Sequence, residues 1–143
     1  MVLDRLGTYH YNLMETVIKL FIIGCGGFTG AVLRYIVSGW VQNRSGSIIF
    51  PFGTMAVNMI GCAVIGMLTY LVDKHSFFSV ETRYFVLVGL LGAFTTFSTF
   101  GNETFNLLHE GRVGLAGINA GGQVFVGLVM VWAGRAIAAG IWR

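Results

Sequence analysis

Four long apolar stretches, separated by narrow bands of charged residues, dominate this sequence of 143 residues. They cover roughly Val17–Trp40, Phe50–Val72, Tyr84–Leu108 and Val113–Ile141. A helix needs about 20 residues to cross the hydrocarbon core of a bilayer, so each stretch is long enough to span a membrane. The sequence therefore predicts an all-α membrane protein with four transmembrane helices and leaves no room for a soluble domain.

The scarcity of charge supports this prediction and excludes other classes of protein. Only 10% of the residues are charged, whereas a soluble globular chain carries about 25%. The net charge of +3 is spread along the chain, so it does not form the basic patch that nucleic-acid binding requires. We therefore expect neither a soluble enzyme nor a nucleic-acid-binding protein.

A short polar head precedes the first span. We expect residues 1–16 to form an N-terminal extension and residues 17–143 to form a single four-helix transmembrane domain. Met14 stands directly before the first span. Translation that starts at Met14 is an open alternative, in which the residues before it are not native.

The middle of every span is uncharged, and this decides between two kinds of transport. Proton-coupled pumps and antiporters need an ionisable group deep in the membrane, and no span carries one at its centre. Passive conduction through neutral groups is therefore favoured.

Pairs of glycines spaced four residues apart, Gly26/Gly30 and Gly117/Gly121, favour close contacts between helices.

Asn58 lies about a third of the way into the second span. An amide at that depth needs hydrogen-bond partners, because an unsatisfied polar group in hydrocarbon costs several kcal/mol. Two interpretations stay open at this point. The side chain either joins helices together or lines a pore, where its NH₂ group donates to an anion.

The stretch from Gly89 to Thr104 mixes hydroxyls and phenyl rings at mid-membrane. Its glycines and β-branched threonines weaken a regular helix, so we expect the third helix to break near its middle, close to Gly92. Phe94, Phe97 and Phe100 recur every three residues and should share one face. Phenyl edges are partly positive and would suit an anion. The alternative is an aromatic core with threonines bonded back to their own helix.

The distribution of Lys and Arg gives only a weak orientation. With four spans, six of these residues fall on the side of the two termini and three on the other. Because cytoplasmic loops are enriched in Lys and Arg, a chain with so small a bias can insert both ways. Antiparallel pairing of identical chains would then be allowed.

Three segments in this order resemble the Fluc (CrcB) family of fluoride channels. They are Gly26–Tyr35, Phe52–Asn58 and Gly92–Glu103. The run Thr95–Phe100 is the most specific of them. The resemblance covers nearly the whole chain from about Lys19 onward.

The resemblance implies a fluoride-selective passive channel that exports toxic cytoplasmic fluoride down its electrochemical gradient. It also implies an antiparallel, dual-topology homodimer in the bacterial inner membrane, with a structural Na⁺ at the dimer interface. The implied fluoride pathway contains Phe97, Phe100, Asn58, Ser98, Thr99 and Thr54. Gly92 and Thr95 would offer backbone carbonyls to the sodium ion, and Arg34 would lie at a pore mouth. Glu103 matches an acidic position of the family without a defined role.

One departure from the family pattern concerns the fourth span. Many relatives carry Ser and Thr where this chain has Leu128 and Trp132, and the only polar side chains between Leu115 and Gly134 are Asn119 and Gln123. Either the pathway uses fewer donors, or the chain is half of a heterodimer. The rival functions are a small multidrug-resistance-type proton antiporter, which needs an acid deep in the first span, and a membrane subunit without transport activity.

Overall fold

The computed structural model describes residues 2–75 and 78–142. Four helical segments are long and apolar enough to cross a membrane: Leu13–Ser45, Phe52–Lys74, Val80–His109 and Val113–Ile141. The prediction of four membrane-spanning helices is confirmed. The first span belongs to α1 (Val2–Ser45), so the described part of the polar head continues into the span as one helix.

The third span is a composite of four elements. It runs through α3 (Val80–Arg83), the π-helix η1 (Tyr84–Leu91), α4 (Gly92–Phe94) and α5 (Phe97–His109). Between α4 and α5 the backbone is extended, with φ −91° and ψ 162° at Thr95 and φ −153° and ψ 119° at Thr96. The predicted break is therefore present. It lies after Gly92, which is helical.

The break follows from the chemistry of two consecutive threonines. The Thr95 hydroxyl donates back to the carbonyl of Leu91 at 3.1 Å. The Thr96 Oγ1 accepts from the N–H of Thr99 at 3.3 Å and caps α5. Both bonds belong to the local side-chain pairing by which Thr competes with helix continuation and favours a helix start.

Close contact between α1 and the third span depends on the predicted glycine pair. A Cβ atom at Gly26 would overlap the carbonyl of Phe85, and one at Gly30 would overlap the carbonyl of Leu90. On the facing helix, Gly89 approaches the backbone of Gly26 in turn. Small residues let two helix backbones touch in this way, so the prediction for Gly26 and Gly30 is confirmed.

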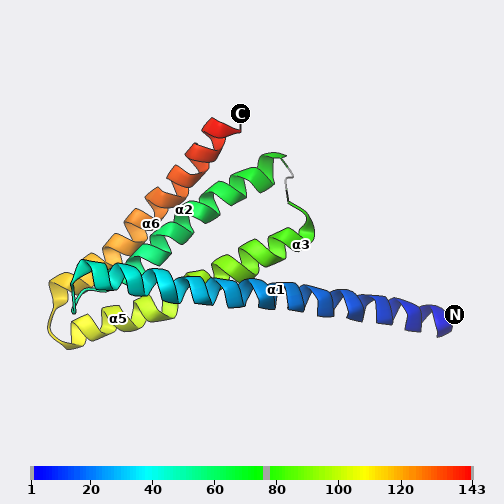
Figure 1. The fold of residues 1–143 in the computed structure, drawn as a ribbon, viewed down its shortest axis with the longest axis horizontal. Helices are drawn as coiled ribbons and strands as arrows, with labels where there is room; N and C mark the ends of the chain where they lie inside the picture. The colour runs from blue at the N-terminus through cyan, green and yellow to red at the C-terminus, as the bar shows by residue number, and fades with distance from the viewer. Residues whose placement is uncertain (1, 76–77, 143) are drawn as a thin grey trace.

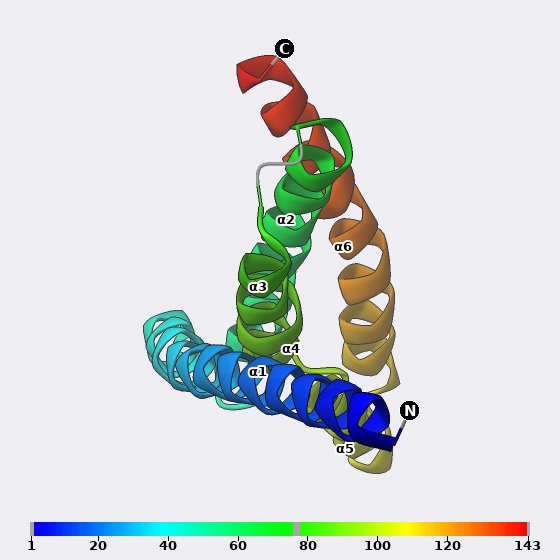
Figure 2. The same cartoon turned by 90° about the vertical axis from the view of Figure 1, so that its right-hand side faces the viewer.

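The second close pair is α2 (Phe52–His75) with α6 (Val113–Ile141), which run side by side in Figures 1 and 2. Side chains at Gly66 or Gly134 would overlap carbonyls of the facing helix. Gly117 and Gly121 behave differently, since a Cβ atom there would meet no atom within 4 Å. The pair therefore makes no close helix contact within the single chain, and its contact with a second copy stays a prediction.

Hydrogen bonds order two of the connections between helices, the one after α5 and the one between α1 and α2. After α5, Gly111 has a positive φ of 74°, and the N–H groups of Gly111 and Arg112 donate to Leu108 and Leu107 at 3.0 and 2.8 Å. This is the Schellman pattern that commonly ends a helix. Between α1 and α2, the Gln42 amide donates to the Phe50 carbonyl at 3.1 Å and accepts from the Gly53 N–H at 2.9 Å.

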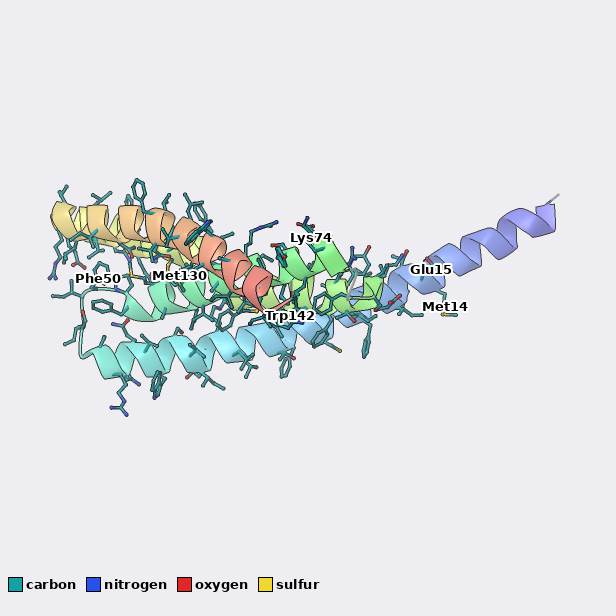
Figure 3. The ribbon with its side chains drawn as sticks, turned by 90° about the horizontal axis from the view of Figure 1, so that it is seen from above. Met14, Glu15, Phe50, Lys74, Met130 and Trp142 are labelled. Carbon is teal, nitrogen blue, oxygen red and sulfur yellow. The ribbon has the colours of Figure 1, made fainter. Side chains whose placement is uncertain are left out.

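Much of the apolar side-chain surface is uncovered in the single chain. Figure 3 shows α1 projecting past the other helices at the end that carries Met14 and Glu15. Large exposed apolar side chains include Phe28, Phe97, Phe125 and Trp132. Hydrocarbon rather than water can surround such a surface, which agrees with the low content of charged residues.

The contact between α1 and η1 yields a test of the fold. We expect Gly30→Ala to lower the free energy of unfolding by about 1–3 kcal/mol, because its Cβ would meet a backbone carbonyl that cannot move freely. Gly27 is the matched control, since a Cβ there meets nothing within 4 Å. Gly27→Ala should leave stability unchanged or raise it by up to about 1 kcal/mol through helix propensity. Denaturant unfolding in mixed micelles measures both, and equal values for the two variants would contradict the contact.

Candidate functional site

The break at Thr95 and Thr96 places the start of a helix inside the third span. The first residues of α5 therefore present backbone N–H groups near mid-membrane, where a continuous helix would have none free. The N-terminal end of a helix is also partly positive. Such an end can attract an anion without any charged side chain.

Asn58 on α2 pairs with the backbone of the break. Its Oδ1 accepts from the N–H of Thr96 at 2.9 Å, and its Nδ2 donates to the carbonyl of the same residue at 3.2 Å. One amide thus satisfies both backbone groups of Thr96, as a neighbouring β-strand would. The expectation that Asn58 needs partners is confirmed.

A series of hydrogen bonds runs from Asn58 through two amide side chains on α6 to a hydroxyl on α5. Asn58 Nδ2 donates to Gln123 Oε1 at 2.6 Å, Gln123 Nε2 donates to Asn119 Oδ1 at 3.0 Å, and Asn119 Nδ2 donates to Thr104 Oγ1 at 2.8 Å. Asn119 is fully buried and Gln123 is 8% exposed. We call Asn58, Gln123 and Asn119, with the hydroxyl of Thr104, the amide chain.

The sequence pattern marks Asn119 and Gln123 only as the polar residues of the fourth span and assigns them no role. Their spacing of four residues places both side chains on one face of α6. That spacing is the signal from which an interhelical chain could have been inferred. Buried polar groups need partners, and Asn58 is the polar residue at similar depth on the neighbouring helix.

Two phenyl rings at the start of α5 lie next to the amide chain. The ring centroids of Phe97 and Phe100 are 5.5 Å apart, with the planes tilted by 58°. Phe97 is 83% exposed in the single chain, whereas Phe94 is buried. The prediction that Phe94 shares a face with the other two is wrong, because the extended residues of the break turn α5 away from α4.

The hydroxyls of Thr96, Ser98 and Thr99 form a small cluster beside the rings. The Thr96 hydroxyl donates to Thr99 Oγ1 at 2.9 Å and lies 3.5 Å from the hydroxyl of Ser98. Ser98 and Thr99 are both exposed in the single chain. These predicted pathway residues are therefore brought together with Phe97 at one end of α5.

The break, the rings and part of the amide chain border one cleft of about 440 Å³. The cleft is open on one side, and most of its wall is apolar. Its lining includes Asn58, Gln123, Gly92, Thr95, Thr96, Phe97 and Phe100. Five of these were predicted from the sequence as site residues, namely Asn58, Gly92, Thr95, Phe97 and Phe100.

Backbone carbonyls at the break are available for a cation. In a continuous helix the N–H of Thr96 would donate to the carbonyl of Gly92, but here it donates to Asn58. Oxygen ligands suit hard cations. In the described part of the chain, no group of three or more His, Cys, Asp or Glu residues could hold a metal ion. The carbonyl of Gly92, without the Thr96 N–H as donor, is an oxygen ligand of the kind that a hard cation takes.

Thr54 lies away from the cleft and binds another predicted residue. Its hydroxyl donates to Glu103 Oε1 at 2.7 Å, and Thr54 itself is buried. Glu103 Oε2 is buried without a hydrogen-bond partner. Glu103 also borders a second hollow of about 310 Å³, which contains the Arg112–Glu110 ion pair of 3.1 Å.

Three further predicted residues lie outside the cleft. Arg34 is half-buried on α1 and does not line it. Leu128 and Trp132, the two residues that depart from the family pattern in the resemblance described above, are 66% and 70% exposed on α6. Both positions therefore belong to an outer face of the single chain, whereas the amide of Gln123 on α6 faces Asn58 on α2.

Comparison with known proteins identifies the family. Residues 21–135 match the family model described as "CrcB-like protein, Camphor Resistance (CrcB)". The chain is 41% identical over 122 residues to "Fluoride-specific ion channel FluC 3" of Methanosarcina barkeri. The matched region covers 85% of this chain and 91% of that protein.

Two other relatives agree with this match. "Fluoride-specific ion channel FluC 1" of Methanosarcina acetivorans is 44% identical over 116 residues, covering 81% of this chain and 87% of the relative. "Fluoride-specific ion channel FluC" of Methylobacillus flagellatus is 44% identical over 116 residues, covering 81% and 91%. With a family match across most of its length and relatives of this similarity, the chain belongs to the CrcB family.

Proposed function

We propose that this protein is a fluoride-selective passive channel that lets cytoplasmic fluoride leave down its electrochemical gradient. The observation that carries the proposal is the pair of rings, Phe97 and Phe100, at a helix start within the third span. The relatives named as fluoride-specific channels support the choice of ion.

The proposed pathway passes along ring edges and neutral donors. Edges of Phe97 and Phe100 carry partial positive charge, and the hydroxyls of Ser98 and Thr99 can donate to an anion. The N-terminal end of α5 adds the dipole of its unpaired N–H groups. Several weak contacts together replace water around fluoride, and none holds the ion so strongly that it cannot leave.

Asn58 takes part in this pathway in a defined way. Both N–H bonds of its Nδ2 point at protein acceptors, the Thr96 carbonyl and Gln123 Oε1. An ion that binds at Asn58 would therefore take the place of one of these acceptors. Thr54, bonded to Glu103, and Arg34 are proposed to act near the ends of the pathway rather than at the rings.

The driving force needs no coupled ion. A membrane potential that is negative inside favours anion exit by about 2.3 kcal/mol per charge for every 100 mV. Fluoride that enters a cell as HF and ionises there would be released through an open pore. We propose that the protein resides in the cell membrane, which in a bacterium is the inner membrane.

A second copy in antiparallel orientation is proposed to complete the pathway. Phe97 is 83% exposed in one chain, and the cleft beside it is open, so one chain cannot enclose an ion. The weak bias of six against three Lys and Arg residues is compatible with insertion in both directions. Two identical chains would then build two equivalent pathways.

A structural sodium ion is proposed between the two copies. The carbonyls of Gly92 and Thr95 would hold it, since both residues line the open side of the break and the Gly92 carbonyl has lost its helical donor to Asn58. Such an ion would link the breaks of the two chains. It would contribute to stability rather than to fluoride movement.

Replacing Phe97 tests the pathway. We expect Phe97→Ile to reduce fluoride efflux from liposomes by at least about tenfold, because the ring edge is lost while an apolar side chain remains. A fluoride electrode measures the efflux, with chloride-loaded vesicles as the test of selectivity. The matched control is Phe105→Ile, which changes another exposed ring of α5 and should leave efflux near the original rate. Unchanged efflux in the Phe97 variant would contradict the pathway.

Sodium dependence tests the proposed cation. An ion that binds only the folded dimer raises stability by about 1.4 kcal/mol for each tenfold rise in concentration above its dissociation constant. We expect the midpoint of thermal unfolding in detergent to rise with NaCl and to stay constant with N-methyl-D-glucamine chloride at equal ionic strength. Equal midpoints in the two salts would refute a structural sodium ion.

A further inference from the structure

Gln123 has no contact with the ion of its own in the proposed pathway, yet both of its polar atoms are used. Its Oε1 accepts from Asn58 at 2.6 Å, and its Nε2 donates to Asn119 at 3.0 Å. The side chain is 8% exposed. It is therefore the bridge by which α6 contacts the residue that holds the break.

The direction of every hydrogen bond in the amide chain can be followed from Thr104. A backbone carbonyl can only accept, so the Thr104 hydroxyl, 2.8 Å from the carbonyl of Phe100, must donate to it. The lone pairs of that hydroxyl then accept from Asn119 Nδ2. This leaves Asn119 Oδ1 to face Gln123, which must present its NH₂ group.

The same logic continues to the break. With its NH₂ group on Asn119, Gln123 presents only Oε1 to Asn58, so Asn58 must turn its own NH₂ toward Gln123. Asn58 Oδ1 then faces the N–H of Thr96. The bonds form a closed loop that leaves α5 at the carbonyl of Phe100, passes through α6 and α2, and returns to Thr96.

We propose that Gln123 is a positioning residue, which ties the Asn58 amide to α6 and thereby fixes the first turn of α5. That turn carries Phe97 and Phe100, so Gln123 determines where the ring edges lie without touching the ion itself. The effect on fluoride movement rests on the proposed function, whereas the effect on the backbone at Thr96 does not.

Hydrogen exchange at the Thr96 amide tests the local part of the proposal. In Gln123→Met, a side chain of similar length without polar ends, Asn58 keeps its two bonds to Thr96 but loses the acceptor that holds it from α6. We expect the Thr96 N–H to exchange at least about tenfold faster, as measured by NMR on the full chain in nanodiscs. Amides of α6 beside its contact with Gly66 should be unaffected. Unchanged exchange at Thr96, or an equal increase throughout α2 and α6, would overturn the proposal.

Two more variants make the result specific. Gln42→Met removes the same groups from a glutamine that bonds the turn between α1 and α2, and it should leave exchange at Thr96 unchanged. Thr104→Val removes the far end of the loop with almost no change in shape. It should raise the exchange rate of the Thr96 N–H several-fold, less than Gln123→Met does. If the Gln123 variant does not fold, Thr104→Val alone shows whether the loop protects the Thr96 amide. No increase in Thr104→Val would count against the loop.

Fluoride efflux from liposomes separates this proposal from the proposed function. If the unaltered protein passes fluoride, Gln123→Met should reduce efflux by at least about tenfold, and full efflux despite faster exchange at Thr96 would refute a role in positioning the pathway. If the unaltered protein passes no fluoride, the proposed function fails, and the exchange data alone still decide whether Gln123 holds Asn58 against the break.

Discussion

A helix cannot break inside a membrane unless the freed backbone groups find partners within the protein. Each unsatisfied N–H or C=O in hydrocarbon costs several kcal/mol. Here the Asn58 amide meets both backbone groups of Thr96, with bonds of 2.9 and 3.2 Å. The helix start of α5, the exposure of Phe97 and the loss of the helical bond between the Thr96 N–H and the Gly92 carbonyl all accompany this pairing. The second helix therefore determines the geometry of the third.

The spans, the close helix contacts and the presence of a break could be predicted because they depend on composition and local spacing. Gly26 and Gly30 pack as their spacing indicates, since a Cβ at either position would overlap the facing backbone. The position of the break could not be read in the same way. Gly92 is the weaker helix former, but the break falls at Thr95 and Thr96, where hydroxyls bond locally and Asn58 arrives from another helix.

The same dependence on neighbouring helices explains what the spacing patterns miss. Periodicity places Phe94 with Phe97 and Phe100 only as long as the helix is continuous, and the extended residues between them remove that condition. Gly117 and Gly121 have the spacing of a contact motif but face away from the chain's other helices. A spacing pattern specifies which residues share a face of a helix. It does not specify what that face meets.

The amides of the fourth span show how a pathway without charge can be organised. An amide supplies two donors and an acceptor at fixed angles, and Gln123 bonds Asn58 and Asn119 at once. In the proposed channel, an ion at Asn58 then competes with a protein acceptor already in place. The donors are held in position before the ion arrives, and releasing the ion restores a bond within the protein. Weak, reversible binding of this kind is what rapid conduction requires.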